Sequence, residues 1–343
     1  MNTSFLFIVC ASLFYSNFAF SGEITPYKAT DAEVEKGFAP YVIPEQCRFT
    51  IGRPISSVPE VVYYFSRPSV SSYPIVFFCT GSSVKGNLYS VIHLHRYFLK
   101  EVLDLHCGLI TVEQWGAENS ENIDEATFFD HYTRTQRLQD HITVIDGLIQ
   151  NPPTGWNGKL VFIGVSEGGL LVTALTALYQ DLTVATVNWS GSGDWFWQDE
   201  LWAFIKDLRK NGSVLFRFAD KLPAWVPFVP CLPKNRDEYD VLMDAIAQEP
   251  THKNEFMGMT YRYHADAMAF PKPEYQRIRT PFLVVTGALD SIVASSRQFV
   301  QKAQSAGAPV TYWEVPGMDH YVRKRVDIVD QSFEWLRTCL NGR

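Results

Sequence analysis

The chain has 343 residues, of which 46% are hydrophobic and 20% are charged, and its formal net charge at pH 7 is −7. This length and apolar content suffice for a large core, built as one α/β domain or as two smaller ones. The sequence lacks the clustered basic residues of a nucleic-acid-binding surface, so we expect no nucleic-acid partner.

The N-terminal segment has the composition of a secretory signal peptide. Its first 22 residues contain no charged side chain, residues 5–20 are mostly apolar, and Ala19, Phe20 and Ser21 form a small-x-small cleavage pattern. We therefore expect cleavage after Ser21 and a secreted or periplasmic mature chain without a stable membrane span. Because the segment has no Lys or Arg, an uncleaved anchor remains the alternative, although the apolar run is short for a span.

The cysteines do not form a recognisable disulfide or zinc pattern. Cleavage would remove Cys10 and leave five of the six, an odd number at wide spacing. Cys79 and Cys107 lie in or beside strand-like segments, which predicts buried free thiols. A single bridge involving Cys47 or Cys231 remains open.

Strand-like runs follow an irregular arm at residues 22–45. Runs rich in β-branched and aromatic residues at 48–51, 61–65 and 75–79 are separated by short connections, which favours antiparallel strands. After residue 80 strands and helices alternate, which predicts a mostly parallel sheet with helices on both faces. The expected helices cover 88–105, 128–148, 170–179, 295–306 and 323–339, and the expected strands cover 109–113, 160–165, 183–188, 282–286 and 310–315.

Residues 191–275 interrupt this alternation. They contain four tryptophans, a proline-rich run and several helical segments, and they are too long for an ordinary connection. We interpret them as a helical cap inserted into the core. The expected organisation is a signal peptide at 1–21, the two parts of an α/β core at 22–190 and 276–343, and the cap between them.

Three glycines surround one serine in the stretch GVSEGG, residues 164–169. An apolar strand precedes the serine and an apolar helix follows it, so G-x-S-x-G lies in the strand-turn-helix setting of a nucleophile elbow. This turn strains Ser166 and exposes its hydroxyl. Gly164 and Gly168 are small because the residues two before and two after the serine crowd each other, and Gly169 is expected to ease helix packing.

An elbow serine needs a histidine to take its proton and a carboxylate to orient that histidine. The expected chain order is serine, acid, histidine. His320 is the only one of eight histidines after the last expected strand, and Asp290 is the only acid in the loop after the preceding strand. Ser166, Asp290 and His320 are therefore the predicted catalytic residues. Glu314 and Asp319 are alternative acids that fit less well, because one lies inside a strand and the other adjoins the histidine.

On these residues the chain resembles the α/β-hydrolase superfamily over roughly residues 47–190 and 276–343. The resemblance implies an eight-stranded sheet whose second strand is antiparallel. It also implies an oxyanion hole that uses the backbone N–H of Glu167 and a second donor from the loop CTGSSVKG. The family often has His-Gly in this loop, and here the donor is assigned to Ser82, with Gly81 and Ser83 as alternatives.

Two other features have both a functional and a structural interpretation. Arg134 and Arg137 are three residues apart and could bind an anionic substrate, but pairing with Asp130, Asp140 or a neighbouring loop is favoured. The cap tryptophans either line a substrate pocket or hold the cap together.

The predicted function is a serine hydrolase that cleaves a small-molecule carboxylic ester or thioester through an acyl-enzyme, with no metal or organic cofactor. A peptidase of the prolyl-oligopeptidase type is the alternative, because the same three residues serve both reactions. It would need a pocket for the amino or prolyl end, to which Asp194, Asp199 or Glu200 could contribute. A non-catalytic binding protein is a second alternative. Dehalogenase or epoxide-hydrolase chemistry is disfavoured because the elbow carries serine rather than aspartate.

Overall fold

The computed structural model describes residues 47–53, 59–85, 88–117, 123–191, 193–212 and 232–342. The expected signal peptide, the arm at 22–45, Cys10 and Cys231 lie outside these residues.

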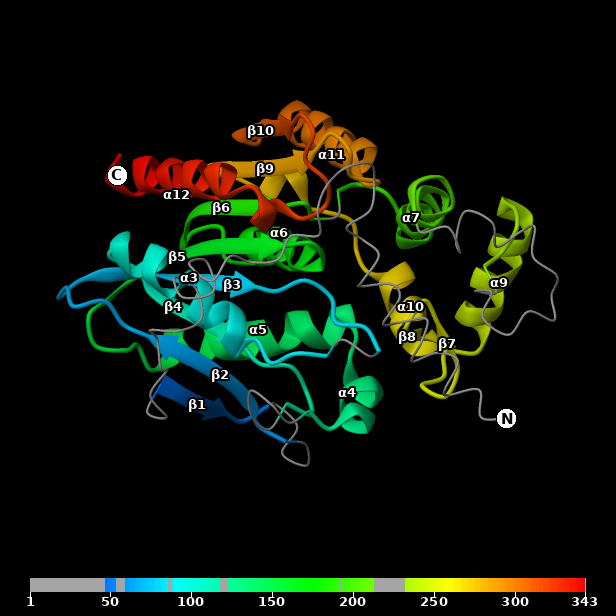
Figure 1. Cartoon of the computed structure of the whole chain (residues 1–343). Coiled ribbons are helices and arrows are strands. Elements are labelled where there is room, and N and C mark those ends of the chain that lie inside the picture. The colour runs from blue at the N-terminus through cyan, green and yellow to red at the C-terminus, as the bar shows by residue number, and fades with distance from the viewer. Residues whose placement is uncertain are drawn as a thin grey trace.

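Eight strands form one sheet in the order β1-β2-β4-β3-β5-β6-β9-β10 (Figure 1). β2 is antiparallel to both β1 and β4, and every other pair is parallel. The strands are β1 (Arg48–Ile51), β2 (Val61–Ser66), β3 (Tyr73–Cys79), β4 (Gly108–Val112), β5 (Trp156–Val165), β6 (Thr183–Trp189), β9 (Phe282–Gly287) and β10 (Val310–Val315). The implied sheet with an antiparallel second strand is confirmed.

As expected, β1 and β2 are antiparallel, and β2 also runs antiparallel to β3. β3 is not a neighbour of β2, however, since β4 lies between them, and β3 pairs in parallel with β4 and β5. Its run YPIVFFC is almost entirely buried, which suits a central strand covered on both faces. The short connection between β2 and β3 therefore does not make these two strands a hairpin.

Helices cover both faces of the sheet, as predicted. Along β3 the side chains alternate. Val76 and Phe78 pack in the cluster that contains α3 (Ile92–Asp104) and α12 (Val326–Asn341), whereas Ile75 and Phe77 pack in the cluster that contains α5 (Arg134–Gln150) and α6 (Glu167–Leu178). Helix α11 (Val293–Ser305) packs beside β9 and β10, and the short helix α4 (Glu125–His131) precedes α5.

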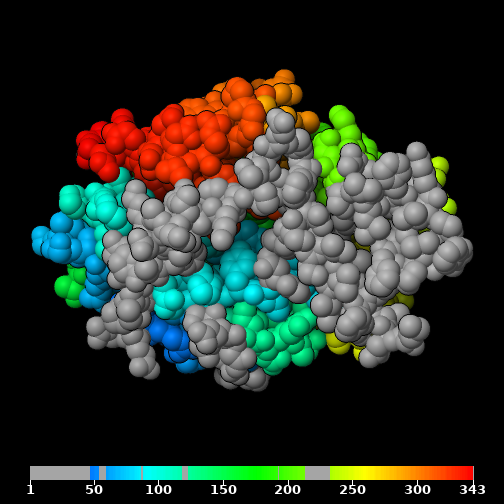
Figure 2. Space-filling model, in the orientation of Figure 1, coloured from blue at the N-terminus to red at the C-terminus, as the bar shows by residue number. Residues whose placement is uncertain are grey.

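The segment between β6 and β9 lies beside the sheet, on the right in Figure 1. Its described elements are α7 (Trp197–Asn211), α9 (Arg236–Gln248), β7 (Glu255–Phe256), β8 (Met259–Thr260) and α10 (Tyr261–Ala269). Apolar residues of α7 and α9, including Ile205, Tyr239 and Met243, form a small core of their own. In the space-filling view the red and orange C-terminal segments form one side of the molecule and the blue N-terminal strands lie on the opposite side (Figure 2).

The helix expected at 128–148 is two helices, α4 and α5. Tyr132 and Thr133 between them are extended, and the Thr133 hydroxyl accepts the N–H of Gln136 at 3.1 Å. This cap satisfies one of the free N–H groups at the start of α5. The pattern Thr-x-x-Gln is a capping signal that the sequence already contained.

Cys79 and Cys107 are buried free thiols, as predicted. Burial raises the pKa of each to about 12, so neither ionises near neutral pH. Cys47 is also a free thiol. Within the described ranges no helix is both long and apolar enough to span a bilayer.

Candidate active site

Ser166 lies between the end of β5 and the start of α6 in a strained backbone conformation. Its φ is 53° and its ψ is −126°, a region that non-glycine residues rarely adopt. The N–H of Ser166 donates to the carbonyl of Trp189 at 2.9 Å, and its carbonyl accepts the N–H of Gly169 at 2.8 Å. The turn is thus held by the end of β6 on one side and by α6 on the other.

The three elbow glycines permit close backbone contacts. A Cβ on Gly164 would lie 2.3 Å from the carbonyl oxygen of Gly168, which is the crowding expected from the motif. A Cβ on Gly168 would lie 2.1 Å from the carbonyl oxygen of Cys79, at the end of β3. A Cβ on Gly169 would lie 2.2 Å from the Asn188 side chain. Gly169 is therefore needed where α6 approaches the end of β6.

Ser166, His320 and Asp290 form one chain of hydrogen bonds across three loops. The Ser166 Oγ is 2.9 Å from the His320 Nε2, and the His320 Nδ1 is 2.9 Å from the Asp290 Oδ2. The Asp290 side chain is fully buried, whereas the His320 side chain is 34% exposed. Gly287, at the end of β9, lets the histidine loop approach, since a Cβ there would lie 2.1 Å from the Met318 carbonyl oxygen.

Both alternative acids have other partners. Glu314 accepts two hydrogen bonds from Arg297, at 2.7 and 2.6 Å. Asp319 accepts the N–H of Tyr321 at 2.8 Å and pairs with Lys324 at 2.6 Å. The geometry therefore favours Asp290 as the carboxylate that orients the histidine.

Charge around the imidazole favours its protonated form. Burial of the ring opposes that form, but the Asp290 carboxylate, with smaller contributions from Asp319 and Glu200, raises the pKa of His320 above its ordinary value of 6.5. A histidine tuned in this way can take a proton from Ser166 and keep it while charge develops on the substrate.

The two loops expected to stabilise an oxyanion lie beside the serine. Glu167 begins α6, where the first N–H groups have no intrahelical partner. In the loop after β3, a Cβ on Gly81 would lie 3.2 Å from the Ser166 Cβ. The N–H of Ser83 donates to the Tyr132 hydroxyl at 2.9 Å, so it is already engaged. Of the three candidate donors in this loop, Ser82 and Gly81 remain.

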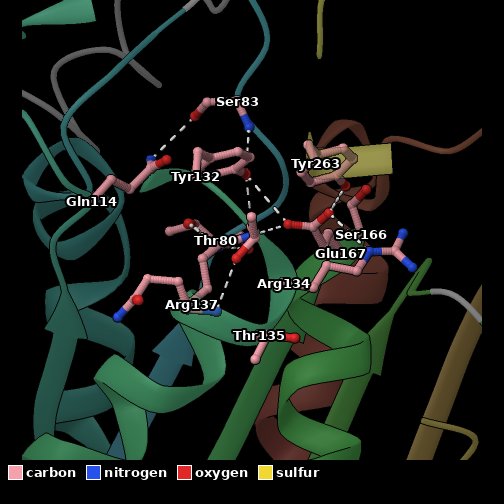
Figure 3. A network of polar contacts seen from close by, with 12 residues as sticks. Thr80, Ser83, Gln114, Tyr132, Arg134, Thr135, Arg137, Ser166, Glu167 and Tyr263 are labelled. Carbon is pink, nitrogen blue, oxygen red and sulfur yellow. Dashed lines mark hydrogen bonds and ion pairs between the residues drawn. The ribbon is translucent and has the colours of Figure 1, made fainter. Parts of the chain in front are cut away.

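The side chain of Glu167 is the centre of a buried polar network that the sequence did not reveal (Figure 3). Its carboxylate accepts hydrogen bonds from the Arg134 Nε at 3.2 Å, from the Arg137 Nη1 and from the hydroxyls of Tyr132 and Tyr263. Burial would raise the pKa of Glu167, but the two guanidinium groups outweigh burial and hold it below its ordinary value. The carboxylate is therefore ionised at neutral pH.

The expected acidic partners of the two arginines were wrong. Their ionic partner is Glu167, while Asp140 pairs with Arg53 at 2.8 and 2.9 Å. The other option, a neighbouring loop, is correct for Arg137, which also contacts Thr80. Helices α5 and α6 each follow a parallel strand, so both begin at the carboxyl edge of the sheet. Residues in their first turns therefore meet there.

A small hollow of about 20 Å³ lies where α5, α6 and α7 meet, and Arg134, Leu170, Trp197 and Glu200 are among its lining residues. Trp197 also donates its indole N–H to His264 at 3.0 Å. This tryptophan thus both lines a hollow and holds α7 against α10. Among the residues that the structure describes, no group of three His, Cys, Asp or Glu side chains is arranged to hold a metal ion.

Comparisons with known proteins agree with this fold. Residues 115–322, more than half of the chain, match the family Hydrolase_4, described as serine aminopeptidase, S33. No curated protein matches the chain. Three solved structures, each covering 86% of this chain, share its fold at low sequence identity. A thermostable carboxyl esterase from Bacillus coagulans is 15% identical with a TM-score of 0.55 and 97% of its own chain covered.

A proline iminopeptidase from Mycobacterium smegmatis is 16% identical, with a TM-score of 0.53 and all of its chain covered. A carboxylesterase structure from Nitrososphaera gargenis is 15% identical, with a TM-score of 0.52 and all of its chain covered. These likenesses show the fold, and the family match over residues 115–322 carries the assignment. The chain belongs to the serine aminopeptidase, S33, family of α/β-hydrolases, and it is a serine hydrolase.

Proposed function

We propose that the chain hydrolyses carboxylic esters, and thioesters by the same chemistry, with Ser166 as nucleophile, His320 as general base and Asp290 as the residue that orients the histidine. The observation that carries this proposal is the continuous hydrogen-bond chain from the Ser166 Oγ to the Asp290 carboxylate, with 2.9 Å at each step. The strained turn that exposes the serine supports it.

In the first half of the reaction, His320 Nε2 takes the hydroxyl proton while Ser166 Oγ attacks the acyl carbon. The resulting oxyanion is stabilised by the N–H of Glu167 and, from the neighbouring loop, by that of Ser82. The ester C–O bond then breaks and His320 gives its proton to the departing alkoxide, so the alcohol leaves and the acyl group remains on Ser166. In the second half, water gives a proton to His320 and attacks the acyl carbon. Collapse of the second oxyanion returns the proton to Ser166 and releases the acid.

A serine peptidase is the second candidate, and the description of the matching family favours it. A peptidase that recognises a free amino terminus would use a carboxylate to pair with the substrate's ammonium group. Asp194 pairs with Lys302 at 2.6 Å, and Asp199 pairs with Arg236 at 2.9 Å on a more exposed surface. Glu200 is buried, lines the hollow and lies close enough to His320 to contribute to its raised pKa. Of the three acids, Glu200 is the one whose charge affects His320, and it already accepts hydrogen bonds from the Gly193 N–H at 3.2 Å and the Ser295 hydroxyl at 2.9 Å.

The test compares wild type with Ser166→Ala, using a fluorophosphonate probe and two substrate classes. The esters are p-nitrophenyl acetate, butyrate and octanoate, and the amides are alanyl and prolyl anilides. Labelling that is lost in Ser166→Ala, with ester turnover above anilide turnover, is the expected result. Faster anilide turnover would move the assignment to peptidase. A folded wild type with neither labelling nor turnover would leave the non-catalytic binding protein.

Secretion is a separate part of the proposal, supported by the uncharged apolar composition of the first 22 residues. Expression of the full chain followed by intact mass measurement tests it. We expect a mature chain that begins at Gly22, recovered from the medium or the periplasm. A full-length chain in the membrane fraction would support the uncleaved anchor instead.

A further inference from the structure

Arg137 connects the elbow to the loop that follows β3. Its Nη2 donates to the Thr80 carbonyl oxygen at 2.7 Å and to the Thr80 hydroxyl at 3.1 Å, while its Nη1 binds the Glu167 carboxylate. The arginine side chain is 8% exposed and that of Glu167 is 3% exposed. One buried guanidinium therefore fixes the first residue of the loop relative to the first residue of α6 (Figure 3).

Tyr132 makes a second connection between the same two segments. Its hydroxyl accepts the N–H of Ser83 at 2.9 Å and donates to the Glu167 carboxylate at 3.3 Å. The Arg137 Nη1 also lies 3.3 Å from this hydroxyl. Gln114 adds a hydrogen bond of 3.1 Å to the Ser83 hydroxyl. The loop is thus held at Ser83 as well as at its first residue.

The two attachments enclose the residues that face the nucleophile. Gly81 and Ser82 lie between Thr80 and Ser83, and Gly81 packs directly on Ser166. Because Ser83 has given its N–H to Tyr132, the N–H groups left for a substrate are those of the two residues between the attachments. Displacing either attachment would move these donors relative to the N–H of Glu167.

The network also determines the local charge near the expected oxyanion position. A lone carboxylate on the residue after the nucleophile would oppose the negative charge that develops on the substrate oxygen. Here Arg134 and Arg137 both bind that carboxylate, and the side chains of all three residues are at most 8% exposed. The two guanidinium groups therefore offset the negative charge of the Glu167 carboxylate, which reduces its repulsion of an oxyanion.

We propose that Arg137 and Tyr132 are positioning residues, which hold the loop at Thr80–Ser83 and the first residue of α6 in the geometry of an oxyanion hole. The proposal rests on the proposed function, because it assigns no group that touches substrate. It predicts that these side chains stabilise the transition state and contribute little to the binding of the ground state.

The test uses Arg137→Lys and Tyr132→Phe in the whole protein, with Arg53→Lys as a matched control. Arg53 pairs with Asp140, the side chains of this pair are 7% and 4% exposed, and Asp140 lies on α5 as Arg137 does. The readouts are kcat and KM for the best p-nitrophenyl ester and the inhibition constant of a trifluoromethyl ketone. That ketone forms a tetrahedral adduct with an oxyanion. The melting temperature of each variant is measured alongside.

We expect kcat to fall about 10- to 100-fold in both variants, with KM within about threefold of wild type. The ketone should lose affinity by the same factor as kcat/KM, because both report binding of the tetrahedral state. The control should keep kcat and ketone affinity even where its melting temperature falls.

Several results would overturn the inference. Folded Arg137→Lys and Tyr132→Phe proteins with kcat and ketone affinity equal to the control would show that the network is only structural. A rise in KM with unchanged kcat would assign these residues to substrate binding. If wild type is neither labelled by fluorophosphonate nor active, the proposed function itself fails, which differs from a loss confined to the two variants.

Discussion

Replacing Ser166 with glycine is expected to stabilise the fold relative to replacing it with alanine. The serine has a φ of 53° and a ψ of −126°, and a side chain in such a conformation costs about 1–3 kcal/mol. Glycine adopts this conformation without a Cβ clash, but it loses about 0.5–1 kcal/mol more conformational freedom on folding. The difference leaves the glycine variant more stable than the alanine variant by about 1 kcal/mol.

The two variants isolate the backbone effect because they share every other loss. Both remove the hydroxyl, which is the proposed nucleophile, and its 2.9 Å hydrogen bond to His320. Urea unfolding followed by tryptophan fluorescence would give the midpoint and slope for each. An alanine variant more stable than the glycine variant by about 0.5–1 kcal/mol, at equal slopes, would show that the turn stores no strain.

Three further predictions concern the site and its supports. The acid limb of kcat/KM should have an apparent pKa above 6.5, because the proposed general base is neutral His320 and the Asp290 carboxylate raises its pKa. In Asp290→Asn this limb should move to lower pH and kcat should fall about 10⁴-fold, as stopped-flow and pH-stat assays would detect. Gly168→Ala should lower the unfolding free energy by about 1–3 kcal/mol and abolish fluorophosphonate labelling, because its Cβ would lie 2.1 Å from a backbone oxygen, whereas Gly52→Ala enters open space and should preserve labelling. Glu167→Gln should cost about 3–5 kcal/mol in urea unfolding, because it leaves two buried guanidinium groups without their counter-ion; an unchanged midpoint would contradict this accounting.

The core of the fold could be predicted because the apolar pattern within a short segment indicates how that segment is buried. The run at 75–79 is apolar on both faces, and a strand of that kind must be covered by helices on each side. The positions of Asp290 and His320 followed from the same rule, since each comes just after the end of a parallel strand. What the sequence did not indicate was strand order, because β3 pairs with β4 and β5 and a short connection says little about neighbours.

The break between α4 and α5 was missed although its signal was present. The segment HYTRTQRLQDH has a single aliphatic residue, Leu138, so hydrophobic periodicity alone does not mark a helix boundary within it. Thr133 and Gln136 have the spacing of a cap, and in the structure the hydroxyl accepts the N–H as that motif requires. Starting α5 at Arg134 also frees Tyr132 to turn toward the elbow.

Missing that boundary is also why the role of the two arginines was missed. Once α5 begins at Arg134, both arginines lie near its N-terminal end, with no acidic residue in the first turn. The helix dipole disfavours cations at this end, and α5 itself supplies no acidic residue there to balance the two arginines. Such an imbalance indicates a partner from elsewhere in the fold. The motif G-x-S-x-G leaves the residue after the serine unspecified, and Glu167 supplies the missing negative charge. The two guanidinium groups and the Glu167 carboxylate are therefore parts of one arrangement. Burying either charge alone would be unfavourable, and each offsets the cost of burying the other.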